Sequence, residues 1–144
     1  METTLESGKV NARASNSADV TFADPAYQAF AILRAGFTVA PILAGADKFF
    51  GLLVDWDKYL PAFVNNLLGG AGHEFMYVVG AIEMIAGIGV AIKPRLFAYV
   101  VAAWLVLIIL NLLMIPGYFD VALRDLGLAL GALALARLSA VYDR

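Results

Sequence analysis

The stretch that decides the fold is Leu96–Ile115, LFAYVVAAWLVLIILNLLMI, in which Asn111 is the only strongly polar side chain. A hydrocarbon core of about 30 Å needs about 20 apolar residues of α-helix to cross it, and this segment has that length. The whole chain agrees, because 62% of its residues are hydrophobic and only 15% are charged. Soluble domains are close to half apolar, and a small one cannot bury this much apolar surface. The sequence therefore predicts an integral membrane protein.

Three further segments resemble this one in length and composition, and all four predicted spans are 27–50, 75–92, 96–115 and 119–142. The breaks between them are chemically consistent: Lys93-Pro94-Arg95 forms a charged turn, and Pro116-Gly117 ends the third span. Short loops place consecutive helices antiparallel. We therefore expect an all-α integral membrane fold, an up-down-up-down bundle of four transmembrane helices occupying residues 27–142.

The first loop differs from the others because it is long and only partly apolar. Aromatic and charged residues come first, and an apolar pattern at helical spacing follows Pro61. This pattern predicts a short helix lying in the membrane interface. Gly69-Gly70-Ala71-Gly72 then turns the chain back into the membrane.

Residues 1–26 form a polar segment rich in Ser, Asn, Thr and Ala, without the apolar core of a cleavable signal peptide. This composition is typical of a disordered cytoplasmic tail. The alternative is a cytoplasmic tail that becomes ordered against a partner protein, anchored by Val20, Phe22, Pro25 and Tyr27. Positive charge favours cytoplasmic termini, because basic residues are more numerous on the side of the termini and the second loop. That side holds Lys9, Arg13, Lys93, Arg95, Arg137 and Arg144, and the other holds Lys48, Lys58 and Arg124.

Ionisable and amide side chains at membrane depth are the candidate functional residues, because such groups are costly in lipid and usually mark an interior network or pathway. Counting along the helices places Arg34 and Glu83 at similar depths, which predicts an ion pair between them. A second group is expected near the opposite membrane face. The candidate network is Arg34, Lys48, Glu83, Asn111, Arg124 and Asp125. It can be a structural device that fixes helix register, or it can line a site for a ligand such as a quinone or a lipid.

Glycines at helical spacing predict where the helices approach one another closely. Gly80 and Gly87 flank Glu83 on the second span, and Gly45 lies on the same face of the first span as Arg34 and Lys48. In the fourth span, Gly127 and Gly131 have the Gly-x-x-x-Gly spacing.

Several chemistries are excluded by composition. The chain has no cysteine and one histidine, so it lacks the ligands of the common zinc and iron–sulfur sites, and His73 has no His-Glu-x-x-His context. No metal site is expected, no cofactor motif is evident, and a net charge of -2 gives no nucleic-acid footprint.

The Arg34-centred start of the first span, its Gly45-Ala46-Asp47-Lys48-Phe49 end, the Gly80-Ala81-Ile82-Glu83 segment and Arg124-Asp125-Leu126 together resemble the DoxX-like family of small bacterial membrane proteins. That family is related to the DoxD subunit of thiosulfate:quinone oxidoreductase. The resemblance covers residues 27–142. It implies the four-helix fold, the bacterial inner membrane, and work beside redox enzymes or in quinone-linked chemistry.

The sequence contains no catalytic constellation, so we expect a non-catalytic accessory subunit of a larger membrane complex that handles electrons. Its partners would be lipids and a membrane protein, bound through the tail and the helix surfaces. The alternative is a quinone-linked oxidoreductase component that uses the polar network. A small-solute transporter is a third reading, which the small number of spans disfavours.

Overall fold

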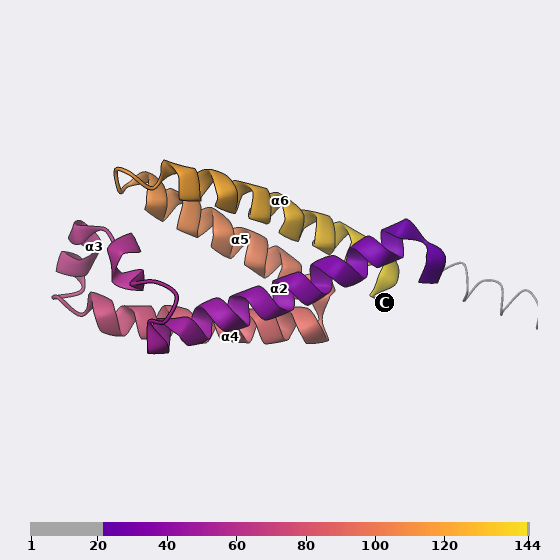
Figure 1. Ribbon diagram of the computed structural model, residues 1–144, viewed down its shortest axis with the longest axis horizontal. Coiled ribbons are helices and arrows are strands. Elements are labelled where there is room, and N and C mark those ends of the chain that lie inside the picture. The colour runs from indigo at the N-terminus through magenta and orange to yellow at the C-terminus, as the bar shows by residue number, and fades with distance from the viewer. Residues whose placement is uncertain (1–21, 144) are drawn as a thin grey trace, which may run out of the picture.

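The computed structural model describes Phe22–Asp143, and within these residues every regular element is a helix (Figure 1). Four long helices are present: α2 (Pro25–Phe50), α4 (Gly72–Ile92), α5 (Pro94–Leu113) and α6 (Phe119–Tyr142). Two short elements, the 3-10 helix η1 (Trp56–Tyr59) and α3 (Ala62–Leu67), occupy the loop between α2 and α4. Most of the expected tail, residues 1–21, lies outside the described residues.

Local chemistry explains where the helices begin and end. The side chain of Asp24 accepts a hydrogen bond from the Ala26 amide at the start of α2, and Pro25 occupies the first helical turn. Gly51 ends α2 in the left-handed conformation, with φ 66°, a geometry that glycine adopts without steric cost. Pro94 begins α5 directly after the one-residue turn at Lys93. The long helices thus lie close to the segments that hydropathy predicts.

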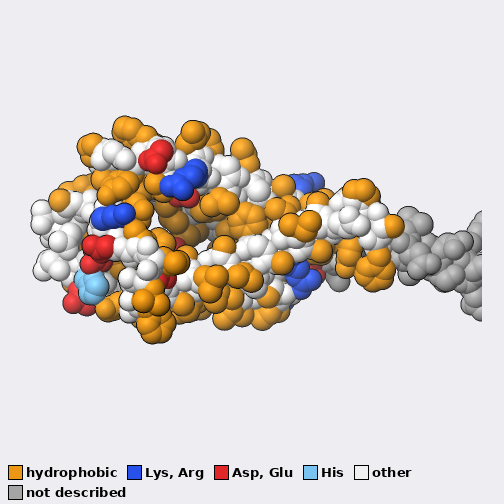
Figure 2. All heavy atoms as spheres, viewed as in Figure 1, with side chains coloured by type: hydrophobic (Ala, Val, Ile, Leu, Met, Phe, Trp, Pro, Cys, Tyr) orange, Lys and Arg blue, Asp and Glu red, His pale blue; other side chains and the backbone are white. Residues whose placement is uncertain are grey.

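The helices associate as two pairs, α2 with α4 and α5 with α6. The pairs meet near the α4–α5 turn and separate toward the end that carries α3 (Figure 1). A space-filling view shows a hollow between the pairs on the visible face, and charged side chains gather mainly at the α3 end (Figure 2). The apolar core occupies the other half of the bundle. Its most buried members are Phe30, Val90, Ala98, Ala132 and Leu135.

Glycines allow α2 and α4 to touch main chain to main chain. A Cβ atom on Gly45 would lie 2.4 Å from the Gly80 carbonyl oxygen, and one on Gly87 would lie 2.7 Å from the Thr38 carbonyl oxygen. In α6 the expected close packing is found only in part. Gly131 faces the Phe37 ring, but a Cβ atom on Gly127 would have nothing within 4 Å, so Gly127 makes no helix contact within the part of the chain that the structure describes. The two helix pairs have already separated at that level.

The outer surface of the bundle is apolar along all four long helices, where large side chains such as Ile32, Ile85, Leu107 and Leu123 are exposed. Three of the helices, α2, α4 and α5, are long and apolar enough to cross a membrane. The all-helical membrane class predicted from composition is therefore confirmed. Helix α6 is not among the three; it carries Asp120, Arg124, Asp125 and Arg137.

Candidate functional site

The half of the bundle next to α3, where the charged side chains gather, is the polar half. At its centre is an ion pair between Lys48 at the end of α2 and Glu83 in the middle of α4. The Lys48 Nζ and Glu83 Oε2 atoms are 2.6 Å apart, and the two side chains are only 4% and 10% exposed. The Gly45–Gly80 contact makes this geometry available. A Cβ atom on Gly80 would lie 3.0 Å from the Lys48 Cβ, so only glycine leaves room for the lysine stem to pass.

The predicted pair between Arg34 and Glu83 is wrong. A guanidinium nitrogen of Arg34 instead donates to the carbonyl oxygen of Ala91, near the C-terminal end of α4. The cause is the helix register. With Gly45 against Gly80, antiparallel helices place Glu83 roughly 12 Å from Arg34 along the axis. Depth counted from the helix ends could not show this, because it ignores which turns touch.

Trp56 of η1 covers the ion pair from the loop. The Lys48 ammonium lies 3.7 Å from the centre of the Trp56 ring, within cation–π range. The Trp56 indole N–H donates to Asp47 Oδ2 at 2.8 Å, and the Leu52 and Leu53 amides also donate to the Asp47 carboxylate. Asp47 therefore holds the start of the loop in place, and the loop holds Trp56 over Lys48.

Helix α5 closes the other side of the site. The Trp104 indole N–H donates to Glu83 Oε1 at 3.3 Å, so both carboxylate oxygens of Glu83 have partners. The side-chain amide of Asn111 donates to the Tyr59 carbonyl oxygen at 2.7 Å. This contact ties η1 to α5, and an edge-on contact between the Tyr59 and Tyr118 rings ties it to the α5–α6 loop.

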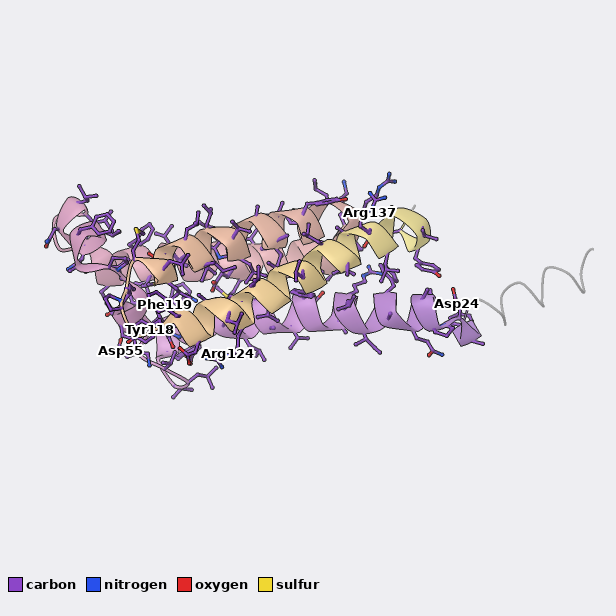
Figure 3. All side chains as sticks on the ribbon, turned by 90° about the horizontal axis from the view of Figure 1, so that it is seen from above. Asp24, Asp55, Tyr118, Phe119, Arg124 and Arg137 are labelled. Atoms are coloured by element: carbon purple, nitrogen blue, oxygen red, sulfur yellow. The ribbon has the colours of Figure 1, made fainter. Side chains whose placement is uncertain are left out.

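The two charged candidates of α6 do not bind this pair directly. Asp125 is half-buried and lies within electrostatic range of Glu83. Arg124 is exposed, and Figure 3 places it at the end of the bundle that also carries Asp55 and Tyr118, opposite the end with Asp24. The structure therefore brings Lys48 and Glu83 together, places Asn111 and Asp125 nearby, and leaves Arg34 and Arg124 outside the centre.

The exposed edge of the polar half, at the start of α4 and beside η1, is the rim. There His73 lies between two partners. Its Nδ1 atom is 2.6 Å from Asp57 Oδ2, and its Nε2 atom is 2.8 Å from the Tyr77 hydroxyl oxygen. The Tyr77 ring stacks on Phe49 with the ring planes 6° apart. The sequence gives His73 no metal-binding context. In the structure its partners are a carboxylate from η1 and a phenol one helical turn away.

Two pockets lie at this end. One, the rim pocket, has a volume of about 240 Å³ and is lined by Lys48, Trp56, Asp57, His73 and Tyr77 among others. A second, of about 270 Å³, lies between α3 and His73. Among the described residues, no buried side-chain polar atom lacks a partner, and no cluster suited to a metal ion is present. The site can hold charge in an apolar setting and admit a small molecule near Lys48.

Sequence reasoning missed Trp56 and Trp104, which contact the pair, and Asp57 and Tyr77, which contact His73. Trp56 comes from a loop and Trp104 from the most apolar helix. Their one sequence feature that points to a buried polar site is the indole N–H group, which needs a hydrogen-bond partner when it is buried.

Comparison of the chain with protein-family models, curated proteins and solved structures gives no significant match.

Proposed function

We propose that this chain is a multi-pass membrane protein that serves as a non-catalytic accessory subunit of a larger, electron-handling membrane complex. The observation that carries the proposal is the closure of the polar centre. Lys48, Glu83, Asp47 and both tryptophan N–H groups are satisfied by one another. A buried pair closed in this way is suited to fixing helix register, and one partner removed would leave a buried charge. The redox context follows from the DoxX-like resemblance.

The proposed membrane arrangement has four spans, with α6 as the fourth. Its support is the antiparallel packing of α6 on α5 and a length of 24 residues, enough to cross the hydrocarbon core. Helix α3 would lie in the interface, since Phe63 and Leu67 are exposed on a short helix beside the bundle end. Positive charge favours cytoplasmic termini, and the family resemblance favours the bacterial inner membrane.

The partner surface is best argued from α6. Arg124 and Gly127 are both exposed there, and Gly127 has open space around its Cα. Charged groups rarely face lipid, and small residues permit close helix approach, so a partner helix suits this face better than acyl chains do. Of the anchors expected before the first span, Tyr27 packs instead against Tyr142 and Phe30 of its own bundle.

Copurification after mild detergent extraction tests the proposal. The tagged protein should retain a stoichiometric membrane protein, which Gly127→Leu should release by blocking close approach. The matched control is Gly36→Leu on α2, because Gly36 also has nothing within 4 Å. A chain that is extracted alone at native expression levels, with no cross-linked partner in intact membranes, contradicts the proposal.

A quinone-linked oxidoreductase component is the second candidate, and the rim pocket is the observation that favours it. The pocket is lined by the aromatic residues Phe49, Trp56 and Tyr77 and by Lys48, whose ammonium would donate to a quinone carbonyl oxygen once Trp56 moves aside. In this case the purified protein should carry a quinone, and Lys48→Met should lose it while the exposed substitution Lys58→Met keeps it. A lipid in the same pocket would be identified by mass spectrometry of the same extract.

A further inference from the structure

The loop element η1 contacts three of the long helices, α2, α4 and α5, and the loop between α5 and α6. Trp56 binds Asp47 at the end of α2, and the Tyr59 carbonyl oxygen accepts from Asn111 of α5. The Tyr59 ring packs on Tyr118 in the α5–α6 loop. Asp57 binds His73 at the start of α4. A four-residue element therefore covers the open end of the bundle, with Trp56 directly over Lys48.

These four attachments respond differently to pH. The attachment through Asn111 is an amide hydrogen bond, and the attachment through Tyr118 is a contact between two rings, so neither depends on an ionic charge. The attachment through Asp47 is a hydrogen bond from an indole N–H. Imidazole is the side chain that ordinarily changes charge between pH 5 and 8. The contact between His73 and Asp57 is thus the attachment that neutral pH can tune. It is also reachable by protons, since the two side chains are 58% and 40% exposed.

We infer that η1 is a lid over the Lys48–Glu83 pair and that protonation of His73 fastens this lid by turning its hydrogen bond to Asp57 into an ion pair. Opening would move Trp56 off Lys48 and admit water to the rim pocket, which Trp56, Asp57 and His73 all line. The device concerns access to the ion pair, so it goes beyond an accessory role and holds whether or not a partner is bound.

The groups around His73 agree on the sign of the effect. Three carboxylates act on His73: Asp57 belongs to η1, Asp55 directly precedes η1, and Glu74 lies on α4. Tyr77 binds Nε2 and can donate to a neutral imidazole or accept from a charged one, so it tolerates both states. Lys48 of α2 lines the same pocket, but its charge is already paired with Glu83. Three carboxylates therefore favour the imidazolium, and the lid is held more firmly at the acidic end of the range.

The test uses the two tryptophans of the chain, labelled as 5-fluorotryptophan in the full-length protein in detergent micelles. The difference in ¹⁹F shift between H₂O and D₂O reports exposure of each indole to water between pH 5.5 and 8.5. Trp104 serves as the internal reference, and Trp56→Phe assigns the two resonances. The water exposure of Trp56 should rise with pH, with the open-to-closed ratio increasing about two- to fivefold, the range expected of a partly exposed ion pair.

Two variants separate lid movement from a direct effect of the imidazole charge on the fluorine signal. His73→Gln retains hydrogen-bonding groups but cannot titrate in this range, so Trp56 exposure should become independent of pH. Asp57→Asn leaves His73 free to titrate but removes the ionic attachment, so exposure should again be flat and should stay at the open level. Helix content by circular dichroism confirms that both variants fold. A wild-type Trp56 with constant exposure, or a pH dependence that survives in Asp57→Asn, overturns the inference.

Discussion

Single residues in the polar half of the bundle differ in how completely the fold surrounds them. Lys48 and Glu83 are enclosed by two helices and a tryptophan ring, whereas His73 and Asp57 remain open to the rim. Substitutions at these two positions should therefore act differently. In the enclosed pair, the energetic cost comes from leaving a charge without its partner. At the rim, water replaces much of what a substitution removes.

Removal of one member of the enclosed pair should strongly destabilise the protein. Lys48→Met leaves Glu83 buried with only the Trp104 N–H as a partner, and the expected loss is about 3–5 kcal/mol in the free energy of unfolding. The double substitution Lys48→Met with Glu83→Leu should lose less than either single change, because no charge is then stranded. A double-mutant cycle of detergent unfolding measures the coupling. Lys58→Met, at an exposed lysine, is the control, and additive losses would argue against the pairing.

Asp24 gives a pH-dependent prediction at the other end of the molecule. The Tyr142 hydroxyl and then the Ala26 amide donate to this carboxylate, and they lower the pKa of Asp24 below its ordinary value of 3.8. A lowered pKa means that the contact stabilises the fold above the ordinary value and that this contribution is lost as pH falls toward the folded-state pKa.

The measurement is an NMR titration of the Asp24 carboxyl carbon. Tyr142→Phe should raise the pKa of Asp24 toward its ordinary value, and part of the lowering should remain because the Ala26 amide still donates. The acid-dependent loss of stability should shrink in the same variant. An unchanged titration in Tyr142→Phe would mean that the hydroxyl does not hold the carboxylate.

At the scale of elements, the contact between α2 and α4 depends on glycines, because any side chain at these positions would collide with the backbone of the other helix. Gly80→Ala should destabilise by about 1–3 kcal/mol, because its Cβ would lie 2.6 Å from the Gly45 carbonyl oxygen. Gly127→Ala is the matched control within a long helix. It has open space and should be neutral or stabilising, by up to about 1 kcal/mol from helix propensity.

Thermal unfolding of the two variants in the same detergent measures the difference. Equal effects at the two positions would mean that the close approach at Gly80 carries no energetic weight. A loss at Gly127 alone would point to packing on α6 that the separated helix pairs do not provide.

Elements were predictable from the sequence to the extent that their signals are local. Hydropathy and the breaks at Lys93-Pro94 and Pro116-Gly117 locate the helices, and Gly69 and Gly70 turn with positive φ where the glycine run predicts a turn. Pairing was less predictable, because helix register depends on which glycines touch. Gly45 and Gly127 both lie in apolar helices, yet only Gly45 meets another backbone. The partner of Glu83 follows from that contact and not from depth.

At the scale of the whole molecule, the position of α6 decides the topology. We expect a reporter fused after Arg144 to be active in the cytoplasm and one inserted at Gly117 to be active on the periplasmic side, because a spanning α6 separates these points. Activity of both fusions on the same side would make α6 a peripheral helix packed on a three-span bundle. A periplasmic reporter at Arg144 with a cytoplasmic one at Gly117 would instead reverse the orientation.

The division of the molecule into two helix pairs has a consequence for its biosynthesis. Lys48 leaves the ribosome 35 residues before Glu83, and η1 and α3 are made in the interval. An unpaired carboxylate such as Glu83 is costly in lipid. We therefore expect α4 to partition from the translocon into the bilayer efficiently only when α2 is still beside the translocon and Lys48 can pair with Glu83. The first two long helices would then enter the bilayer as a neutralised hairpin. The strongly apolar α5 needs no such help.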